Sequence, residues 1–200
     1  MKLVKQSFEV HPINFEEALK SIERTARTCY KSFDKITEDS HKEFVKRLIE
    51  RGHEAMLEFA DLAVTFVTNR SLANELVRHR LASFAQESTR YVNYRLSGIH
   101  FVLPEWWEDS TDEQTKIFYE QLKSAEKAYM DLIAEGWSPQ QAREVLPNAL
   151  RTKIVVKANF REWRHILKLR TDKTAHPQMK ALMSDLASYL KQECPIVFSI

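Results

Sequence analysis

The sequence predicts an α+β fold in a single domain over residues 1–200, with a mixed or antiparallel sheet flanked by helices. Strand-like and helix-like segments are interspersed without the regular strand–helix alternation that is typical of a parallel α/β fold. A chain of 200 residues with 44% hydrophobic residues is long enough to bury one core without disulfides. No internal repeat, low-complexity tract or linker interrupts it.

Three segments have the character of β-strands. Residues 57–68, LEFADLAVTFVT, are rich in β-branched and aromatic side chains, and residues 151–158, RTKIVVKA, form a second clear strand pattern. Residues 2–9 alternate between apolar and polar side chains. We therefore expect strands at these three places.

Helices are indicated by capping residues and by apolar side chains that recur every three or four positions. Asn14 with Glu17, and Asn159 with Glu162, match the capping-box pattern. Ser71 is expected to cap a short helix. The predicted helices cover residues 15–26, 40–51, 71–80, 105–134, 139–146, 160–170 and 179–190. Residues 81–98 are polar and aperiodic, and we expect an ordered loop there.

Composition narrows the classes of function. The formal net charge is only +2, so no strong overall field attracts nucleic acid. No segment approaches the roughly 20 apolar residues of a membrane span, and MKLVKQSFEV lacks the apolar core of a signal peptide. Cys29 and Cys194 form no CxxC motif. We therefore expect a cytoplasmic protein that binds neither nucleic acid nor a membrane.

Glycine is scarce, which restricts how the chain can hold an anion. The only glycines, Gly52, Gly98 and Gly136, lie far apart. Phosphate loops and dinucleotide fingerprints need clustered glycines, because backbone N–H groups must approach the phosphate. An anionic ligand must therefore be held by side chains or by helix N-termini.

The densest group of candidate site residues is Arg78-His79-Arg80. Successive helix residues point about 100° apart, so one helix face cannot direct all three side chains at one ligand. Either the helix frays here or the group serves more than one ligand or subunit. A solvated basic helix end is the alternative, because the helix dipole favours cations there. The next loop adds donors at a spacing that suits an oxyanion, namely Gln86, Ser88, Thr89 and Arg90.

The segment RHRLASFAQESTRY resembles the signature of flavin-dependent thymidylate synthases, RHR-x7-S followed by an arginine. Other segments resemble further blocks of this family, in the same order along the chain. They are RGHE at 51–54 with Glu58, AREVLP at 142–147, NFR at 159–161 and LRTD at 169–172. The resemblance covers most of the chain, from about residue 20 to residue 197.

The resemblance implies a methyltransferase that converts dUMP to dTMP. FAD is the implied cofactor, NADPH and methylene-tetrahydrofolate are the implied co-substrates, and the implied assembly is a homotetramer with shared active sites. The implied FAD contacts are His53, Arg78, His79, Arg80, Gln86, Asn159, Arg161 and His165. The implied dUMP contacts are Glu75, Arg78, Gln86, Ser88, Arg90, Arg143 and Arg170. Arg170 would face the uracil as the catalytic residue, stabilising negative charge as C5 becomes nucleophilic.

Three positions depart from the family pattern. Glu75 stands where glutamine is common, Ala55 where a hydroxyl residue is common, and Phe59 where histidine is common. An acid at position 75 would repel a phosphate that it faced. These departures concern individual contacts rather than the activity.

Two other functions are open to the same residues. Glu50-x-x-His53 and Glu162-x-x-His165 match the pattern that di-iron carboxylate proteins use twice. However, Gly52 interrupts the first helix and arginines crowd the second pair. A nucleic-acid-binding module is indicated by the arginines and tyrosines of residues 78–95, but the chain has no basic excess. We favour the thymidylate synthase.

Overall fold

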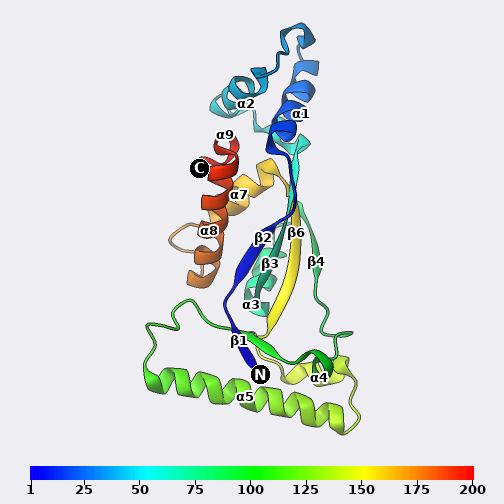
Figure 1. The fold of residues 1–200 in the computed structure, drawn as a ribbon, viewed down its shortest axis with the longest axis vertical. Helices are drawn as coiled ribbons and strands as arrows, with labels where there is room; N and C mark the ends of the chain where they lie inside the picture. The colour runs from blue at the N-terminus through cyan, green and yellow to red at the C-terminus, as the bar shows by residue number, and fades with distance from the viewer. The chain divides into compact units, whose positions relative to one another are not determined.

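The computed structural model describes residues 1–200 and shows an α+β fold with two sheets (Figure 1). In the smaller sheet, β1 (Lys2–Val4) pairs in parallel with β5 (His100–Val102), with Lys2 opposite His100. The strand order of the larger sheet is β2 (Ser7–Val10), β3 (Asp61–Asn69), β6 (Arg151–Asn159) and β4 (Ala82–Gln86). The α+β prediction is confirmed.

The helices alternate irregularly with these strands. The α-helices are α1 (Phe15–Thr28), α2 (Ser40–Glu50), α3 (Arg70–Leu76), α4 (Tyr94–Ser97), α5 (Asp112–Ala134), α6 (Pro139–Ala142), α7 (Phe160–Arg170), α8 (Pro177–Glu193) and α9 (Pro195–Phe198). Short 3₁₀ helices are η1 (Phe33–Lys35), η2 (Glu54–Phe59) and η3 (Arg143–Val145). No helix combines the length and the apolar character that crossing a bilayer requires.

Two helix starts were predicted from their caps and are confirmed. The Asn14 side chain accepts a hydrogen bond from the Glu17 N–H at the start of α1, at 3.1 Å. The Asn159 side chain does the same for the Glu162 N–H at the start of α7, at 2.8 Å. Each bond satisfies a backbone donor that has no partner within its helix.

Several predicted boundaries are wrong. Residues 57–59 belong to η2, and the strand begins only at Asp61. Asn69, not Ser71, caps α3, because its side chain accepts from the Leu72 N–H at 2.8 Å. That helix ends at Leu76, so the Arg-His-Arg group lies beyond it.

Three further segments differ from the prediction. The long helix begins at Asp112 rather than at 105, because Thr111 and Gln114 form a reciprocal capping box. Residues 81–98 hold β4 and α4 instead of a loop alone. Residues 2–9 form two strands, which belong to different sheets. The strands within residues 81–98 and 2–9 form because they pair with strands distant in sequence, which local composition does not reveal.

The chain forms two compact units, each assembled from three separate segments. The first unit consists of Met1–Phe8, Thr65–Arg78 and Phe84–Val155, and the second of Glu9–Val64, His79–Ser83 and Val156–Ile200. The chain passes from one unit to the other within each strand of the larger sheet.

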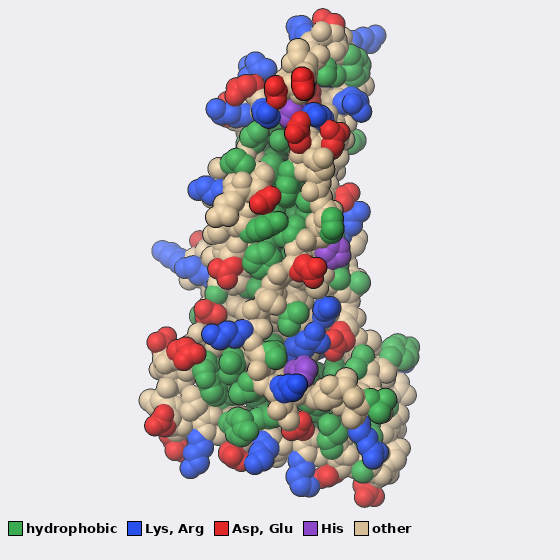
Figure 2. Space-filling model, viewed as in Figure 1, with side chains coloured by type: hydrophobic (Ala, Val, Ile, Leu, Met, Phe, Trp, Pro, Cys, Tyr) green, Lys and Arg blue, Asp and Glu red, His purple; other side chains and the backbone are tan.

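Each unit has its own apolar core. In the first, Tyr129 of α5 packs edge-on against Tyr94 at 5.8 Å, and its hydroxyl accepts a hydrogen bond from the Tyr94 N–H. In the second, α7, α8 and α9 pack together (Figure 1), Trp163 and Phe160 of α7 are fully buried, and Phe160 lies edge-on to Phe198 of α9 at 5.4 Å. Outside the cores, Figure 2 shows basic and acidic side chains interspersed on the face drawn, as expected from a net charge of +2.

Candidate active site

The three side chains of the Arg-His-Arg group differ in burial. His79 is 6% exposed, whereas Arg78 and Arg80 are exposed. The neighbouring residues therefore do not present a single basic surface to one small ligand. The histidine belongs to the interior of the second unit, and the arginines are accessible from outside.

His79 is held by a hydrogen bond from the end of α7. The Nε atom of Arg170 donates to Nε2 of His79 at 2.9 Å. Because Nε2 accepts this bond, a neutral His79 carries its proton on Nδ1. That nitrogen lies 3.7 Å from the Glu162 carboxylate, and the His165 ring lies edge-on with its centroid at 6.2 Å. Three side chains of α7 thus meet His79, which is distant from them in sequence, within the second unit.

The environment keeps His79 uncharged. Burial lowers the pKa of His79 to about 4, and the positive charges of Arg170 and His165 act in the same direction. Burial also raises the pKa of Glu162, against a smaller opposing effect of His165. At neutral pH the imidazole is therefore a fixed hydrogen-bond acceptor for the Arg170 guanidinium.

The same cluster contains one group of potential metal ligands. The candidate ligand atoms of His79, Glu162 and His165 all lie within 4.8 Å of one another. On His79, however, Nε2 accepts from Arg170, so the proton occupies Nδ1 and no lone pair is left for a cation. Glu50 and His53 do not join this group. The arrangement does not support the di-iron hypothesis.

The remaining FAD candidates of the second unit lie at the start of α7 and near η2. Arg161 pairs with Glu58 at 2.7 Å, and both side chains are about half exposed. Asn159 uses its carbonyl oxygen to cap α7, which leaves its amide N–H groups as donors. His53 is exposed and makes no capping bond to η2. These donors fit flavin carbonyl and phosphate oxygens in chemical type.

A second group of predicted residues meets in the first unit. Arg143 donates to the Thr89 hydroxyl at 3.2 Å, and Arg90 donates to the Gln140 side chain at 3.4 Å. The Ser88 hydroxyl accepts from the Arg90 N–H at 3.3 Å. Two guanidinium groups and two hydroxyl groups therefore lie around one loop, a donor set that suits a phosphate.

The other two predicted contacts have different surroundings. Gln86, at the end of β4, donates to the Thr152 hydroxyl of β6 at 3.3 Å, so part of its amide is already used by the sheet. Glu75 lies in the last turn of α3 and is partly exposed.

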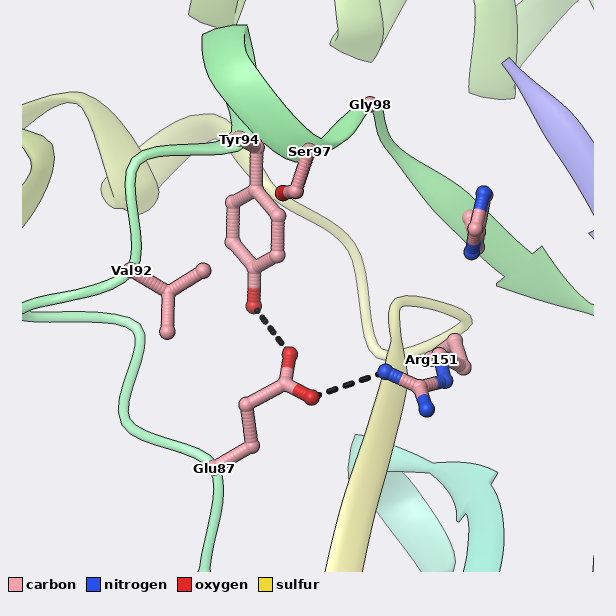
Figure 3. Close-up of a pocket in the computed structure, with 7 residues that line it drawn as sticks. Glu87, Val92, Tyr94, Ser97, Gly98 and Arg151 are labelled. Atoms are coloured by element: carbon pink, nitrogen blue, oxygen red, sulfur yellow. Dashed lines mark hydrogen bonds and ion pairs between the residues drawn. The ribbon is translucent and has the colours of Figure 1, made fainter.

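The sequence analysis missed an acidic residue, Glu87, in the loop that follows β4. Glu87 projects between Tyr94 and Arg151 and borders a pocket of about 210 Å³ (Figure 3). Its carboxylate accepts from the Tyr94 hydroxyl at 3.1 Å and from Arg151 at 2.8 Å. The position of Glu87 between two predicted site residues, Gln86 and Ser88, could have drawn attention to it. Its hydrogen-bond partners could not be identified from the local sequence.

The buried neutral histidine makes stability depend on pH. The unfolded chain protonates this residue near pH 6.5, whereas the folded protein keeps it neutral down to about pH 4. The unfolded state therefore binds more protons within this interval. Above pH 6.5 the contribution of His79 to the free energy of unfolding has its full value. This contribution falls by an amount on the order of 3 kcal/mol as the pH drops to 4.

Urea unfolding at pH 7 and pH 4.5 would measure this effect in the wild type and in His79→Gln. Glutamine can still accept from Arg170 but does not titrate, so the variant should lose less stability on acidification. The raised pKa of Glu162 has the opposite effect, because it increases the free energy of unfolding as the pH falls. Glu162 is present in both proteins, so this effect cancels when they are compared. Equal losses in the two proteins would contradict the prediction.

The chain is similar to proteins of one family. The model of the thymidylate synthase complementing protein family matches residues 13–196. The flavin-dependent thymidylate synthase of Geobacter sulfurreducens is 32% identical in an alignment 180 residues long, which covers 86% of this chain and 77% of that protein. Its counterpart from Mycobacterium tuberculosis is 32% identical in an alignment 197 residues long, which covers 89% of this chain and 77% of that protein.

A solved structure shows the same fold. A UMP/dUMP methylase from Streptomyces cacaoi, bound with 5-Br dUMP, superposes with a TM-score of 0.82. The superposition covers all of this chain and 96% of that one, at 21% sequence identity. At this identity the likeness concerns the fold, and it extends over both compact units.

Proposed function

The chain belongs to the family of flavin-dependent thymidylate synthases, and on this premise we propose how its residues share the conversion of dUMP to dTMP. The family match over residues 13–196 carries the assignment. The reaction is a reductive methylation in which bound FAD provides redox chemistry and methylene-tetrahydrofolate provides the carbon. NADPH is the proposed source of reducing equivalents.

We assign FAD binding to exposed donors and to the cluster around His79. The residues are His53, Arg78, His79, Arg80, Gln86, Asn159, Arg161 and His165. The exposed guanidinium groups of Arg78 and Arg80 support contacts with phosphate oxygens, since no glycine-rich loop is present. The amide donors of Asn159 support a contact with a carbonyl group of the flavin.

The group of guanidinium and hydroxyl donors in the first unit is assigned to the dUMP phosphate and sugar. Ser88, Arg90 and Arg143 lie around the same loop and together offer hydroxyl and guanidinium donors. Arginine can bind phosphate oxygens through two parallel hydrogen bonds. Glu75, Arg78 and Gln86 are proposed as further contacts to the nucleotide, and the acid at position 75 would avoid the phosphate itself.

Arg170 is assigned to the uracil ring. Its Nε atom is bound to the neutral His79, so the plane of the guanidinium is fixed before substrate arrives. A preorganised donor of this kind stabilises negative charge that develops on a carbonyl oxygen as C5 becomes nucleophilic. The side chain performs no proton transfer, because a guanidinium stays protonated.

We further propose a homotetramer with active sites shared between subunits. The support is the divergence of the Arg-His-Arg group, in which one side chain is buried and two are exposed. Exposed arginines that flank a buried site residue are suited to a ligand held against a neighbouring subunit. Light scattering should then report about four times the chain mass of 23.5 kDa.

The absorption spectrum of the purified protein tests the function. We expect flavin bands, either as isolated or after titration with FAD, because the assigned residues offer donors for its carbonyl and phosphate oxygens. Addition of dUMP should then perturb these bands, because the proposed reaction requires the nucleotide to bind near the flavin. UMP and dTMP serve as comparison ligands. A protein that stays colourless with excess FAD would overturn the proposed function.

A further inference from the structure

Both backbone hydrogen-bonding groups of Glu87 have partners. Its N–H donates to the Lys153 carbonyl of β6 at 2.9 Å. Its own carbonyl accepts from the Arg70 guanidinium at 3.3 Å. The next residue is Ser88. The backbone just before the loop that contains Ser88 and Arg90 is therefore fixed by two hydrogen bonds.

The side chain of Glu87 is fixed as well. Each carboxylate oxygen has a separate partner, the Tyr94 hydroxyl on one side and Arg151 on the other (Figure 3). Tyr94 is 5% exposed and its N–H donates to the Tyr129 hydroxyl, so the link leads into the core of the first unit. Burial and the Glu87 charge raise the pKa of Tyr94, so its hydroxyl remains a donor.

We propose that Glu87 is a positioning residue for dUMP binding, which holds the loop with Ser88 and Arg90 in the geometry that receives the phosphate. The inference rests on the proposed function, in which those two residues contact the nucleotide. Glu87 itself need not touch the substrate: both its carboxylate oxygens are already bound, and its acid charge would repel a phosphate. Its contribution is to reduce the loop conformations that binding would otherwise have to restrict.

The pocket beside Glu87 offers a specific test of this role. It measures about 210 Å³ and is lined by Glu87, Tyr94, Arg151 and His100 together with the Val92 and Ser97–Gly98 positions. A cavity of this size has room for a small carboxylate beside Arg151 once the glutamate side chain is removed. Acetate can then replace the missing group without being attached to the chain.

The experiment measures KM for dUMP, kcat and bound FAD in Glu87→Gln and Glu87→Ala. In Glu87→Ala, KM should rise about tenfold with little change in kcat, because a charge-assisted link to the loop is lost. Glu87→Gln, which retains the shape and one of the two acceptor oxygens, should show a smaller rise. Added sodium acetate should bring the KM of Glu87→Ala back toward the wild-type value, and sodium chloride at equal ionic strength should not.

Asp131→Ala is the matched control in the same unit. It removes the acid of an exposed ion pair with Lys127 on α5. Because this pair lies on the surface of a helix, its loss should leave KM for dUMP unchanged and insensitive to acetate. The control separates the loss of a particular carboxylate from the loss of one surface charge.

Three results would overturn the proposal. An unchanged KM in Glu87→Ala, while Ser88→Ala and Arg90→Ala raise it, would reject the positioning role and leave the proposed function standing. A joint fall in kcat, bound FAD and thermal stability without acetate rescue would show a merely structural role. If Ser88→Ala and Arg90→Ala also leave KM unchanged, the substrate assignment fails and the proposal fails with it.

Discussion

Replacing Arg170 with alanine is expected to lower dTMP formation about a hundredfold or more, while bound FAD stays near the wild-type amount. The expectation follows from the assignment of this guanidinium to the uracil ring. Loss of one preorganised donor at a developing negative charge costs about 2.7–4 kcal/mol of transition-state stabilisation. A cation that only complements the dipole at the end of α7 would contribute about 0.3–1 kcal/mol to stability and nothing to catalysis.

The contact with His79 makes the conservative variant informative. Lysine at position 170 retains the charge, but an ammonium group cannot reproduce the planar fork that binds His79 and a carbonyl together. We therefore expect Arg170→Lys to recover little activity. Lys168→Ala is the control, since this exposed cation lies in the same last turn of the helix.

The measurement is dTMP formation from dUMP and methylene-tetrahydrofolate, with bound flavin quantified in the same samples. Flavin oxidation by both substrates should slow in parallel with product formation. Near-normal dTMP formation by Arg170→Ala would show that another residue faces the uracil, and the family assignment would remain.

Replacing Trp163 with alanine is expected to cost about 3–5 kcal/mol of folding free energy. This side chain is fully buried in the second unit, and its indole N–H donates to the Leu62 carbonyl at 2.9 Å. Removing the ring leaves a cavity among α7 and its neighbours and also leaves that carbonyl without its donor. Few single changes in this chain combine both penalties.

Trp163→Phe separates the two contributions. Phenylalanine fills most of the space but cannot donate to Leu62, so this variant should lose about 1–3 kcal/mol. Urea unfolding followed by circular dichroism gives both values. A loss below about 1 kcal/mol in Trp163→Ala would mean that the core around α7 collapses onto the vacancy more completely than close packing allows.

The parts of the fold that sequence predicted well are those with local causes. Asn14 and Asn159 cap helices through their own side chains, and β6 contains the β-branched run Ile154-Val155-Val156. The short strand β4 was missed because ASFAQ has little strand character, and pairing with β6 in the sheet orders it. Local chemistry therefore located helix starts better than edge strands.

The candidate site divides in the same way. Motif blocks pointed to most of its candidate residues singly, including Arg170, Ser88 and Arg143, whose roles stay predictions, and the family match supports the activity that they imply. The bond between His79 and Arg170 joins positions 91 residues apart, and that between Glu87 and Arg151 joins positions 64 residues apart. No periodicity or spacing encodes such pairs, because they depend on how the whole chain is folded.

The interleaving of the two units has a consequence for the nascent chain. Residues Met1–Phe8 leave the ribosome well before Phe84–Val155, the segment that completes their unit, and β1 must wait for β5. Glu9–Val64 waits longer still, because Val156–Ile200 brings Trp163 and the rest of its core. Incomplete units expose apolar surface and unpaired strand edges, which promote aggregation. We therefore expect the early segments to be most prone to association with other chains before Val156–Ile200 has been synthesised.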